Sequence, residues 1–436
     1  MTAQRMTLKP SNPLPAQADV VIIGGGVAGV SAALYLAQQN VSVVLCEKGR
    51  IAGEQSSRNW GWIRKMGRDA RELPLVIAST ALWQQLADEM TEDIGFRVGG
   101  ATYLAKTEAD LAERVAWLEE NRSFGLDSKV LNSRQTDEIL GREDGCFQGA
   151  LHTASDAMAE PAIAVPALAR HAASLGAHVI ENCAVRTVER SGGKISAVIT
   201  EHGRIACQAV ILAGGVWSRV FLENLGLSFP QLAIKSSVLR IGPTATPQVT
   251  GAVGSSRVSI RARQDGGYTL ARSGAAEFQM IPAALRHFPA YVPILKKRWR
   301  IMKLRAGKDF FGPLGRARWQ GDDITPFEKN RVLNPEPDKA LLEDVLQSAR
   351  QLFPKMGDAQ PKETWAGMID VMPDEIPVID RVPNHEGMWM ATGLSGHGFG
   401  IGPGVGLLAA QLITGETPVA DPKPFAFSRF SQKVAA

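Results

Sequence analysis

Cysteine is scarce in this sequence. The 436 residues include four, Cys46, Cys146, Cys183 and Cys207, which lie far apart and form no C-x-x-C motif. This pattern excludes a disulfide framework and a zinc site of the usual spacing, and it lacks the closely spaced cysteines of an iron–sulfur cluster. We therefore expect a protein of a reducing compartment, the cytoplasm, without a metal site.

Long apolar runs are also absent. No stretch of the sequence reaches the roughly 18 consecutive apolar residues that a membrane-spanning helix needs. Residues 1–18 contain Pro10, Pro13 and Pro15 among scattered polar residues, and they lack the apolar core of a signal peptide. We expect these residues to form a disordered tail.

A strong excess of one charge is missing as well. Lysine and arginine number 48 and aspartate and glutamate 44, so the net charge is +4. This small excess is spread along the chain without a binding motif, so we expect no nucleic-acid partner. One segment, 296–308 (KKRWRIMKLRAGK), is densely basic. It fits the solvated face of a helix; the alternatives are peripheral contact with an anionic membrane surface or with a redox partner protein.

The clearest motif lies near the start of the chain. A β-branched run, Val20 to Ile23, is followed by a G-x-G-x-x-G sequence at Gly24, Gly26 and Gly29, then by helical spacing to residue 39 and a second apolar run that ends at Glu47. Strand, glycine turn, helix, strand and acid in this order are typical of a dinucleotide-binding βαβ unit. Its glycines allow a tight turn, close approach of a pyrophosphate and close helix packing, and the acid accepts a ribose hydroxyl.

The remaining periodicity predicts a second domain. Helical spacing recurs over residues 73–90, 108–124, 162–175, 282–305 and 339–352, and from near Pro403 to residue 413. Strand patterns occur at 96–105, 205–213, 376–380 and 388–392, in a hairpin of 185–188 and 195–200 that turns at 191–194, and at 236–241, 258–263 and 267–271. The last three runs suggest an antiparallel sheet. We expect an α/β chain (α+β overall) of two domains.

We expect the Rossmann-type domain to be discontinuous. It would comprise residues 19–75, 150–230 and 362–436. The substrate-binding domain, built on the antiparallel sheet, would comprise residues 76–149 and 231–361.

Three motifs together resemble one known family. The βαβ unit, AGGVW at 213–217 and GLSGHGFGIGPGVG at 393–406 are similar, in order and spacing, to the D-amino-acid oxidase family of flavoproteins, and within it to glycine oxidase and monomeric sarcosine oxidase. The resemblance implies that FAD, without a metal, oxidises the C–N bond of a secondary amine, D-amino acid or glycine-like substrate. Hydride passes to flavin N5 and the resulting imine is hydrolysed.

The resemblance also implies a set of cofactor contacts. They are Gly24, Gly26, Val27, Ala28, Gly29, Glu47, Lys48, Ser56, Ser57, Arg58, Asn59, Trp60, Gly61, Val185, Ala213, Gly214, Gly215, Trp217, Gly393, Leu394, Ser395, Gly396, His397, Gly398, Phe399, Gly400 and Ile401. In the family the histidine of the last segment is a structural part of its loop, so we do not expect His397 to be catalytic.

Three departures from the family pattern are informative. Gly367 or Met368 stands where sarcosine-oxidase relatives attach FAD to a cysteine, so we expect non-covalent FAD. Gly400 replaces a lysine that binds substrate carboxylate in several relatives, and Thr269 stands near the place of a lysine linked to the reaction with oxygen. The electron acceptor is therefore oxygen or another molecule.

Four residues are candidates for the substrate side of the site. Arg64 could bind a substrate carboxylate, although it could equally be a phosphate ligand or a surface residue. Trp62 and Tyr268 are candidates for the pocket, with the core as the alternative. Asp370 could contact a cationic substrate.

Two further functions use the same fold. One is oxidation of a hydroxy acid or polyol phosphate. The other is the role of FAD subunit in an amine or opine dehydrogenase whose partner chains carry iron–sulfur centres. The sequence does not specify the substrate or the oligomeric state.

Overall fold

The computed structural model describes residues 14–244, 249–298, 302–305, 307–315, 318–357 and 359–433. Residues 1–13 of the expected tail lie outside these ranges, as do residues 299–301 and 306 of the basic segment. The prediction of disorder is wrong for residues 14–18. Gln17 forms a β-bridge with Ala206, and Ala18 is buried and donates its N–H to the Ala206 carbonyl at 2.9 Å.

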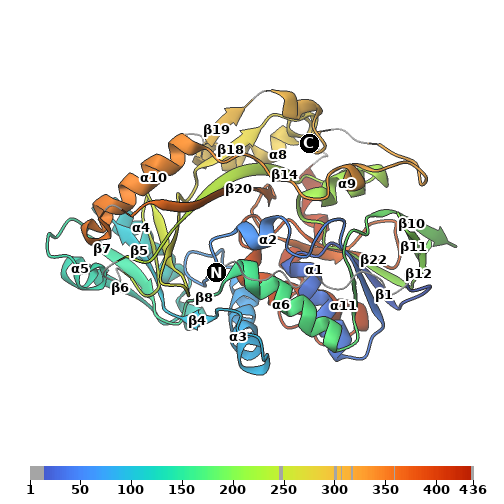
Figure 1. Ribbon diagram of the computed structural model, residues 1–436, viewed down its shortest axis with the longest axis horizontal. Coiled ribbons are helices and arrows are strands. Elements are labelled where there is room, and N and C mark those ends of the chain that lie inside the picture. Colours follow the sequence, from blue (N-terminus) through green and yellow to red (C-terminus); the bar gives the residue numbers. More distant parts are fainter. Residues whose placement is uncertain are drawn as a thin grey trace.

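A six-stranded sheet forms the centre of one half of the molecule (Figure 1). Its order is β21 (Val378–Arg381), β22 (Met388–Thr392), β13 (Ala209–Leu212), β1 (Val20–Ile23), β2 (Val43–Cys46) and β9 (His178–Ile180). All neighbours pair in parallel except β21 and β22. Every residue of β1 is buried, as a central parallel strand requires.

Different elements cover the two faces of this sheet. Val20 and Ile22 of β1 pack in a cluster with α1 (Val27–Gln38), α3 (Leu73–Glu89), α6 (Pro161–Ser174) and α11 (Gly398–Thr414). Val21 and Ile23 point the other way. They pack with β10 (Val185–Ser191), β11 (Lys194–Thr200), β12 (Gly203–Ala206) and α7 (Ser218–Asn224).

A ten-stranded, mainly antiparallel sheet forms the other half (Figure 1). Its path is β19 (Met302–Arg305), β18 (Ala276–Gln279), β14 (Leu232–Ile241), β17 (Tyr268–Ala271), β16 (Ser259–Ala262), β15 (Ala252–Gly254), β5 (Ala101–Ala105), β7 (Gly149–Thr153) and β6 (Ser128–Asn132), and β20 (Pro361–Val371) pairs with β14. The helix α10 (Lys339–Leu352) packs against one part of this sheet and α8 (Pro282–Arg298) against another.

The strand pairing places two segments in a different domain from the one that we expected. Strand β20 pairs with β14 from Leu232–Val371 to Ile241–Pro361, and β7 pairs with β5 and β6. Residues 150–153 and 362–371, which we assigned to the cofactor-binding domain, therefore belong to the large sheet. We propose the remaining boundaries as they stand.

The shorter elements lie around the two sheets. They are α2 (Gln55–Arg58), α4 (Glu108–Glu120), α5 (Ser133–Leu140), α9 (Pro326–Lys329), and a small sheet of β3 (Trp62–Ile63), β8 (Ala157–Met158) and β4 (Arg97–Val98). Helices α4 and α5 pack against β5, β6 and β7 of the large sheet. Within the described residues, none of the helices combines the length and apolar character that crossing a membrane requires.

Local patterns located most elements correctly. The helices expected at 73–90, 108–124, 162–175 and 339–352 are present, and the expected hairpin turns at Gly192 and Gly193, whose φ angles are 59° and 86°. Two expectations are wrong. Residues 205–213 fall in two strands, β12 and β13, and 282–305 is helical only to Arg298, because 302–305 pair with β18.

The start of α11 also differs from the expectation. The helix begins at Gly398 rather than near Pro403, and the proline lies inside it. Proline lacks the N–H that would bond to the Phe399 carbonyl. The indole of Trp83 donates to that oxygen at 3.2 Å, and the Ser79 hydroxyl bonds to both the Gly400 carbonyl (2.9 Å) and the Gly404 N–H (3.1 Å). Side chains of α3 thus form hydrogen bonds with the backbone groups of α11 near the proline.

Helices α1 and α11 are packed so closely that glycine is required between them. A Cβ atom at Gly402 would lie 2.3 Å from Cγ2 of Val27, and one at Gly406 would lie 2.4 Å from Cβ of Ser31 and 2.5 Å from the Ala32 nitrogen. These contacts join the N-terminal βαβ unit to the C-terminal helix. They bring the glycine turn at 24–29 and the loop at 393–398 to the same side of the sheet.

We predict that Gly406→Val destabilises the protein by about 1–3 kcal/mol, because the new side chain must displace backbone as well as side chains. Thermal unfolding measures the change. The control is Gly321→Ala, where a Cβ has nothing within 4 Å, and we expect an effect below about 0.5 kcal/mol. Equal melting temperatures for the two variants would contradict the close contact.

Candidate functional site

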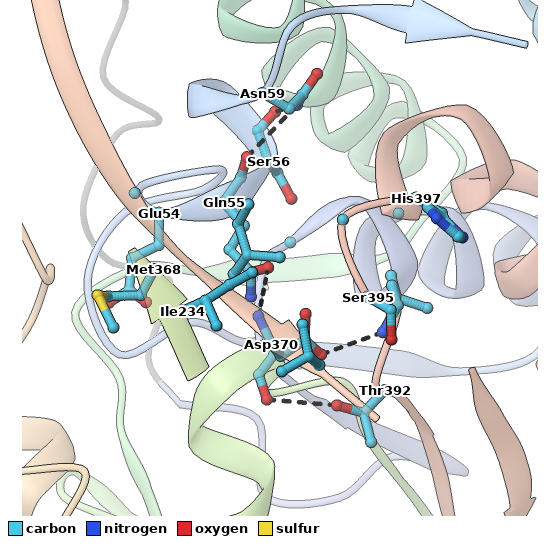
Figure 2. A pocket seen from close by; sticks show the side chains of 18 of the residues that line it. Glu54, Gln55, Ser56, Asn59, Ile234, Met368, Asp370, Thr392, Ser395 and His397 are labelled. Carbon is cyan, nitrogen blue, oxygen red and sulfur yellow. Dashed lines mark hydrogen bonds between the residues drawn. The ribbon is translucent and has the colours of Figure 1, made fainter. Parts of the chain in front are cut away.

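One cavity of about 530 Å³ runs between the two sheets. Its walls come from the turn after β1, residues 52–60, the segment after β13, the loop before α11, strands β14 and β20, and α8. Figure 2 shows a part of it, where Gln55 and Ser56 lie on one side and Asp370, Thr392, Ser395 and His397 on another. All three motifs of the sequence therefore meet at one cavity.

The turn after β1 has the shape that a phosphate group requires. Gly24 has a φ of 113°, and a Cβ there would lie 2.5 Å from the Ala213 carbonyl oxygen. Gly26 precedes α1, whose first turn has no acidic residue and no side-chain cap at Gly26. The Val27 N–H donates to the Ser56 hydroxyl at 2.9 Å. The positive end of α1 thus faces the cavity, as an anion site requires.

Glu47 lies at the far end of β2 beside this turn. Its carboxylate accepts the N–H groups of Gly25 and Gly49, each at 2.7 Å. Burial raises its pKa to about 7, and these bonds oppose the shift. Its neighbour Lys48 is bonded to Glu54 at 2.7 Å and lies 4.6 Å over the Trp217 ring, so its charge is already paired.

Most of the expected cofactor contacts line the cavity. They are Gly24, Gly26, Val27, Ala28, Glu47, Lys48, Ser56, Arg58, Asn59, Trp60, Val185, Ala213, Gly214, Gly215, Trp217, Leu394, Ser395, Gly396, His397, Gly398, Phe399 and Gly400.

The other five have structural surroundings instead. A Cβ at Gly29 would lie 2.0 Å from the Gly24 oxygen, and one at Gly61 would lie 2.4 Å from the Ala159 oxygen, so both serve close backbone packing. The hydroxyl of Ser57 lies 3.5 Å from the Glu54 oxygen. The Gly393 N–H is donated to Asp370 at 2.8 Å, and Ile401 is fully buried in α11.

Asp370 holds the loop that precedes α11. Besides the Gly393 N–H, its carboxylate accepts the Leu394 N–H at 3.2 Å and the Gln231 amide at 3.1 Å. The N–H of Asp370 itself donates to Gln55 at 3.2 Å (Figure 2). Burial raises its pKa. The bonds from Gly393, Leu394 and Gln231 all go to Oδ2, so Asp370 holds the loop while it lines the cavity, and its contact with a cationic substrate stays a prediction. The roles of Gln55 and Gln231 gave no signal in the sequence.

Two arginines line the cavity. Arg64 donates to the Met66 carbonyl, and its guanidinium carbon lies 5.3 Å from the centre of the Tyr103 ring. Arg68 is 4% exposed, its Nε lies 3.4 Å from the Arg64 oxygen, and its Nη1 has no hydrogen-bond partner. Within the described chain neither forms an ion pair. Burial, and then the charge of Arg64, lower the pKa of Arg68 to about 10. We call Arg64 and Arg68 the arginine pair.

His397 and Glu72 lie beside the arginine pair. Nδ1 of His397 is 3.2 Å from the carboxylate of Glu72, which is completely buried. Burial and the charge of Arg68 lower the pKa of His397, while Glu72 opposes the shift. Although burial acts against ionisation of Glu72, His397 and Arg68 lower its pKa. Glu72 thus fixes the histidine at the start of α11, in agreement with a structural role.

Of the two remaining candidates, Trp62 lines the cavity and Tyr268 does not. The Trp62 ring makes edge contacts with Trp60 and Tyr103, each at 5.9 Å between centres. Tyr268 is 2% exposed and packs in the apolar core between the large sheet and α10. The alternation that suggested a pocket residue in β17 cannot distinguish the two faces of a sheet that is covered on both. Tyr268 therefore has the core position that was the alternative interpretation.

Comparison with known proteins agrees with this geometry. A family model described as DAO, FAD dependent oxidoreductase, matches residues 19–412. Sarcosine oxidase subunit beta from an Arthrobacter species is 27% identical over 431 residues, which are 96% of this chain and 93% of the relative. Glycine oxidase from Pseudomonas aeruginosa is 27% identical, with coverage of 93% and 98%.

A solved structure shares the whole architecture. L-amino acid deaminase from Proteus myxofaciens, in complex with anthranilate, superposes with a TM-score of 0.91 at 29% identity and covers 96% of this chain and 95% of that one. These findings confirm the predicted family, the mixed α/β fold and FAD as the cofactor. They also confirm an oxidoreductase that acts on the C–N bond of an amine or amino acid. The chain belongs to the DAO family of FAD-dependent oxidoreductases.

Proposed function

We propose that the substrate is an amino acid whose carboxylate binds the arginine pair. The observation that carries the proposal is the buried guanidinium of Arg68, which lines the cavity with Nη1 unpartnered. The nearby Glu72 carboxylate favours the charged form of Arg68 but, within the described residues, accepts no hydrogen bond from it, and a carboxylate is the group that a guanidinium binds in bidentate fashion. The same pair suits the carboxylate of a hydroxy acid, which remains the second candidate.

The departure at Gly400 supports this assignment. In relatives that carry a lysine at the corresponding position, that lysine binds the substrate carboxylate. Here a Cβ at Gly400 would lie 3.2 Å from the Trp62 oxygen and 3.7 Å from the Arg64 nitrogen. The glycine therefore lies directly beside the segment that carries the arginine pair. Arg64 and Arg68 supply positive charge close to the place where a lysine would have supplied it.

The lining residues are well suited to hold FAD. Glu47 is placed for a ribose, the start of α1 with Ser56 for the pyrophosphate, and residues 394–400 for the flavin. Bound FAD supplies the hydride acceptor for the carbon that bears the nitrogen. The chain orients the substrate through the arginine pair, and Trp60, Trp62 and Tyr103 exclude water beside it. Asp370 and Glu72 fix the two ends of the loop 393–397.

We further propose an electron acceptor other than oxygen. Among the described residues that line the cavity, Lys48 is the only lysine, and its ammonium group is bonded to Glu54 and to the carbonyls of Asn330 and Arg331. Thr269 does not line the cavity and accepts hydrogen bonds from Arg261 and Arg263. A free lysine of the kind linked to the oxygen reaction in one branch of the family is thus missing from the described walls.

The described part of the basic segment supports peripheral attachment, in the cytoplasm, to a membrane or redox partner. Lys296 and Lys303 are exposed, although Lys303 pairs with Asp338 at 2.8 Å, and the apolar side chains of Leu304 and Phe311 nearby are exposed as well. Cations beside exposed apolar groups are typical of surfaces that bind anionic lipid. The four thiols are free, three of them buried, which fits a reducing compartment.

We predict that Arg68→Met weakens the binding of an amino acid by about 10- to 100-fold, because a charged hydrogen bond of about 1.5–3 kcal/mol is lost. Steady-state kinetics and titration with a competitive carboxylate measure it. The decarboxylated amine should be unaffected, and so should the flavin midpoint potential. The control is Arg71→Met, on an exposed arginine paired with Asp69. If Arg68→Met weakens binding of the amino acid and of the amine equally and lowers the flavin midpoint potential, Arg68 acts on the flavin rather than on the substrate carboxylate.

We predict that acid precipitation releases all FAD into the supernatant. Gly367 and Met368 line the cavity where relatives attach the flavin, and the cysteine among the described lining residues is Cys46, which lies at the end of β2 next to Glu47. Absorbance of the washed pellet checks this. A yellow pellet would establish a covalent bond.

We predict that Lys296→Glu with Lys303→Glu reduces pelleting with anionic lipid vesicles several-fold at low salt. The matched control is Lys106→Glu with Lys129→Glu, exposed lysines at the opposite end of the large sheet. Equal pelleting of both variants and the parent would rule out attachment through this segment.

A further inference from the structure

The cavity continues past the loop 393–397 into a branch with apolar walls. We call it the apolar branch. Its walls come from β14, β18, β20 and α8, and they include Ile234, Phe278, Met280, Ala284, Ile294 and Leu295. Five of these residues belong to one apolar cluster, and Met280 directly precedes its member Ile281. The branch therefore favours a ligand group without charge.

The hydroxyl group of Tyr291, which also lines the cavity, is already hydrogen-bonded. The hydroxyl of Tyr291 donates to the Val371 carbonyl at 2.6 Å and lies 2.9 Å from the Pro230 carbonyl. It anchors α8 to β20, one residue from Asp370, and leaves no free donor for a ligand. The fixed contact also makes α8 a defined wall, so a change in its inward side chains should change the size of the branch.

The apolar branch and the arginine pair meet at the same loop. A Cβ at Gly396 would lie 3.6 Å from Cγ2 of Ile369, which packs against the apolar cluster. The next residue, His397, contacts Glu72 beside Arg68. A molecule placed over this loop thus has cations on one side and an apolar hollow on the other.

The branch also opens to the surface. Phe288 and Leu304 both line the cavity, yet they are 55% and 64% exposed. They lie on α8 and β19 and mark the opening. A substrate can therefore enter between these two elements with its apolar end in contact with the wall.

We propose that the apolar branch is the subsite for the side chain of the substrate, and that the enzyme selects amino acids with a large aliphatic or aromatic side chain. The assignment rests on the proposed function, since the carboxylate must lie at the arginine pair. Each methylene group buried in such a subsite strengthens binding about fourfold. Glycine and alanine, which leave the branch empty, should be poor substrates.

The first experiment needs no variant. Straight-chain carboxylates from acetate to hexanoate are titrated into the holoenzyme, and the change in the flavin spectrum gives a dissociation constant for each. We expect the constant to fall about fourfold per methylene. In anaerobic reduction, kcat/KM for leucine or phenylalanine should exceed that for alanine at least tenfold. If the dissociation constant does not depend on the chain length of the carboxylate, the proposed subsite is wrong.

The second experiment fills the branch. Ala284→Phe places a ring in the hollow, and Leu285→Phe places the same ring on the neighbouring residue of α8, which is 59% exposed and does not line the cavity. We expect Ala284→Phe to lower kcat/KM for leucine at least tenfold while alanine changes less than threefold, and Leu285→Phe to change neither. If Ala284→Phe leaves reduction by leucine intact but blocks reoxidation by a soluble quinone, the branch belongs to the acceptor and the proposal is overturned.

Different results would show that the proposed subsite is wrong and that the proposed function is wrong. If alanine and leucine reduce the flavin equally well, the subsite is wrong and amino-acid oxidation stands. If no amino acid reduces the flavin, the proposed function itself fails.

Discussion

The close contact between α1 and α11 is the constraint on which the site depends. Glycine at 402 and 406 lets the two helices approach until a Cβ atom would touch backbone. Because one helix follows the first strand and the other lies near the end of the chain, this contact brings both glycine-rich segments to one cavity. The proline inside α11 is tolerated because Ser79 and Trp83 of α3 bond to the helix where its own ladder is interrupted. Packing far from the substrate thus fixes the loop at 393–397.

The charges around that loop are divided between structure and ligand binding. The carboxylates of Asp370 and Glu72 are buried, and each is bonded to part of the loop. The arginine pair, by contrast, lines the cavity beside the positive end of α11, forms no ion pair in the described chain, and includes the unpartnered Nη1 of Arg68. The two carboxylates near the loop therefore hold the loop in place, and the arginine pair remains to bind a ligand. An anionic substrate fits this arrangement better than a simple amine.

The sequence predicted the features that depend on residues close together in the chain, and it failed for features that depend on contacts between distant residues. The βαβ unit, the Gly192–Gly193 hairpin and most helices depend on neighbours in the chain, and they were located from sequence patterns alone. The start of α11 was misplaced because its stability comes from α3, more than 300 residues away in the chain. The core position of Tyr268, the bonds of Asp370 to the loop and the burial of Arg68 could not be predicted, because they depend on which face of a sheet is covered and on which side chains already have partners.

Anaerobic titration of the purified holoenzyme tests the central claim most directly. The long-wavelength absorbance of the flavin is followed as leucine, its decarboxylated amine or the matching 2-hydroxy acid is added. The account predicts rapid bleaching by the amino acid, and slow or no bleaching by the amine and the hydroxy acid. Bleaching by the amine as fast as by leucine, or by the hydroxy acid alone, would contradict it.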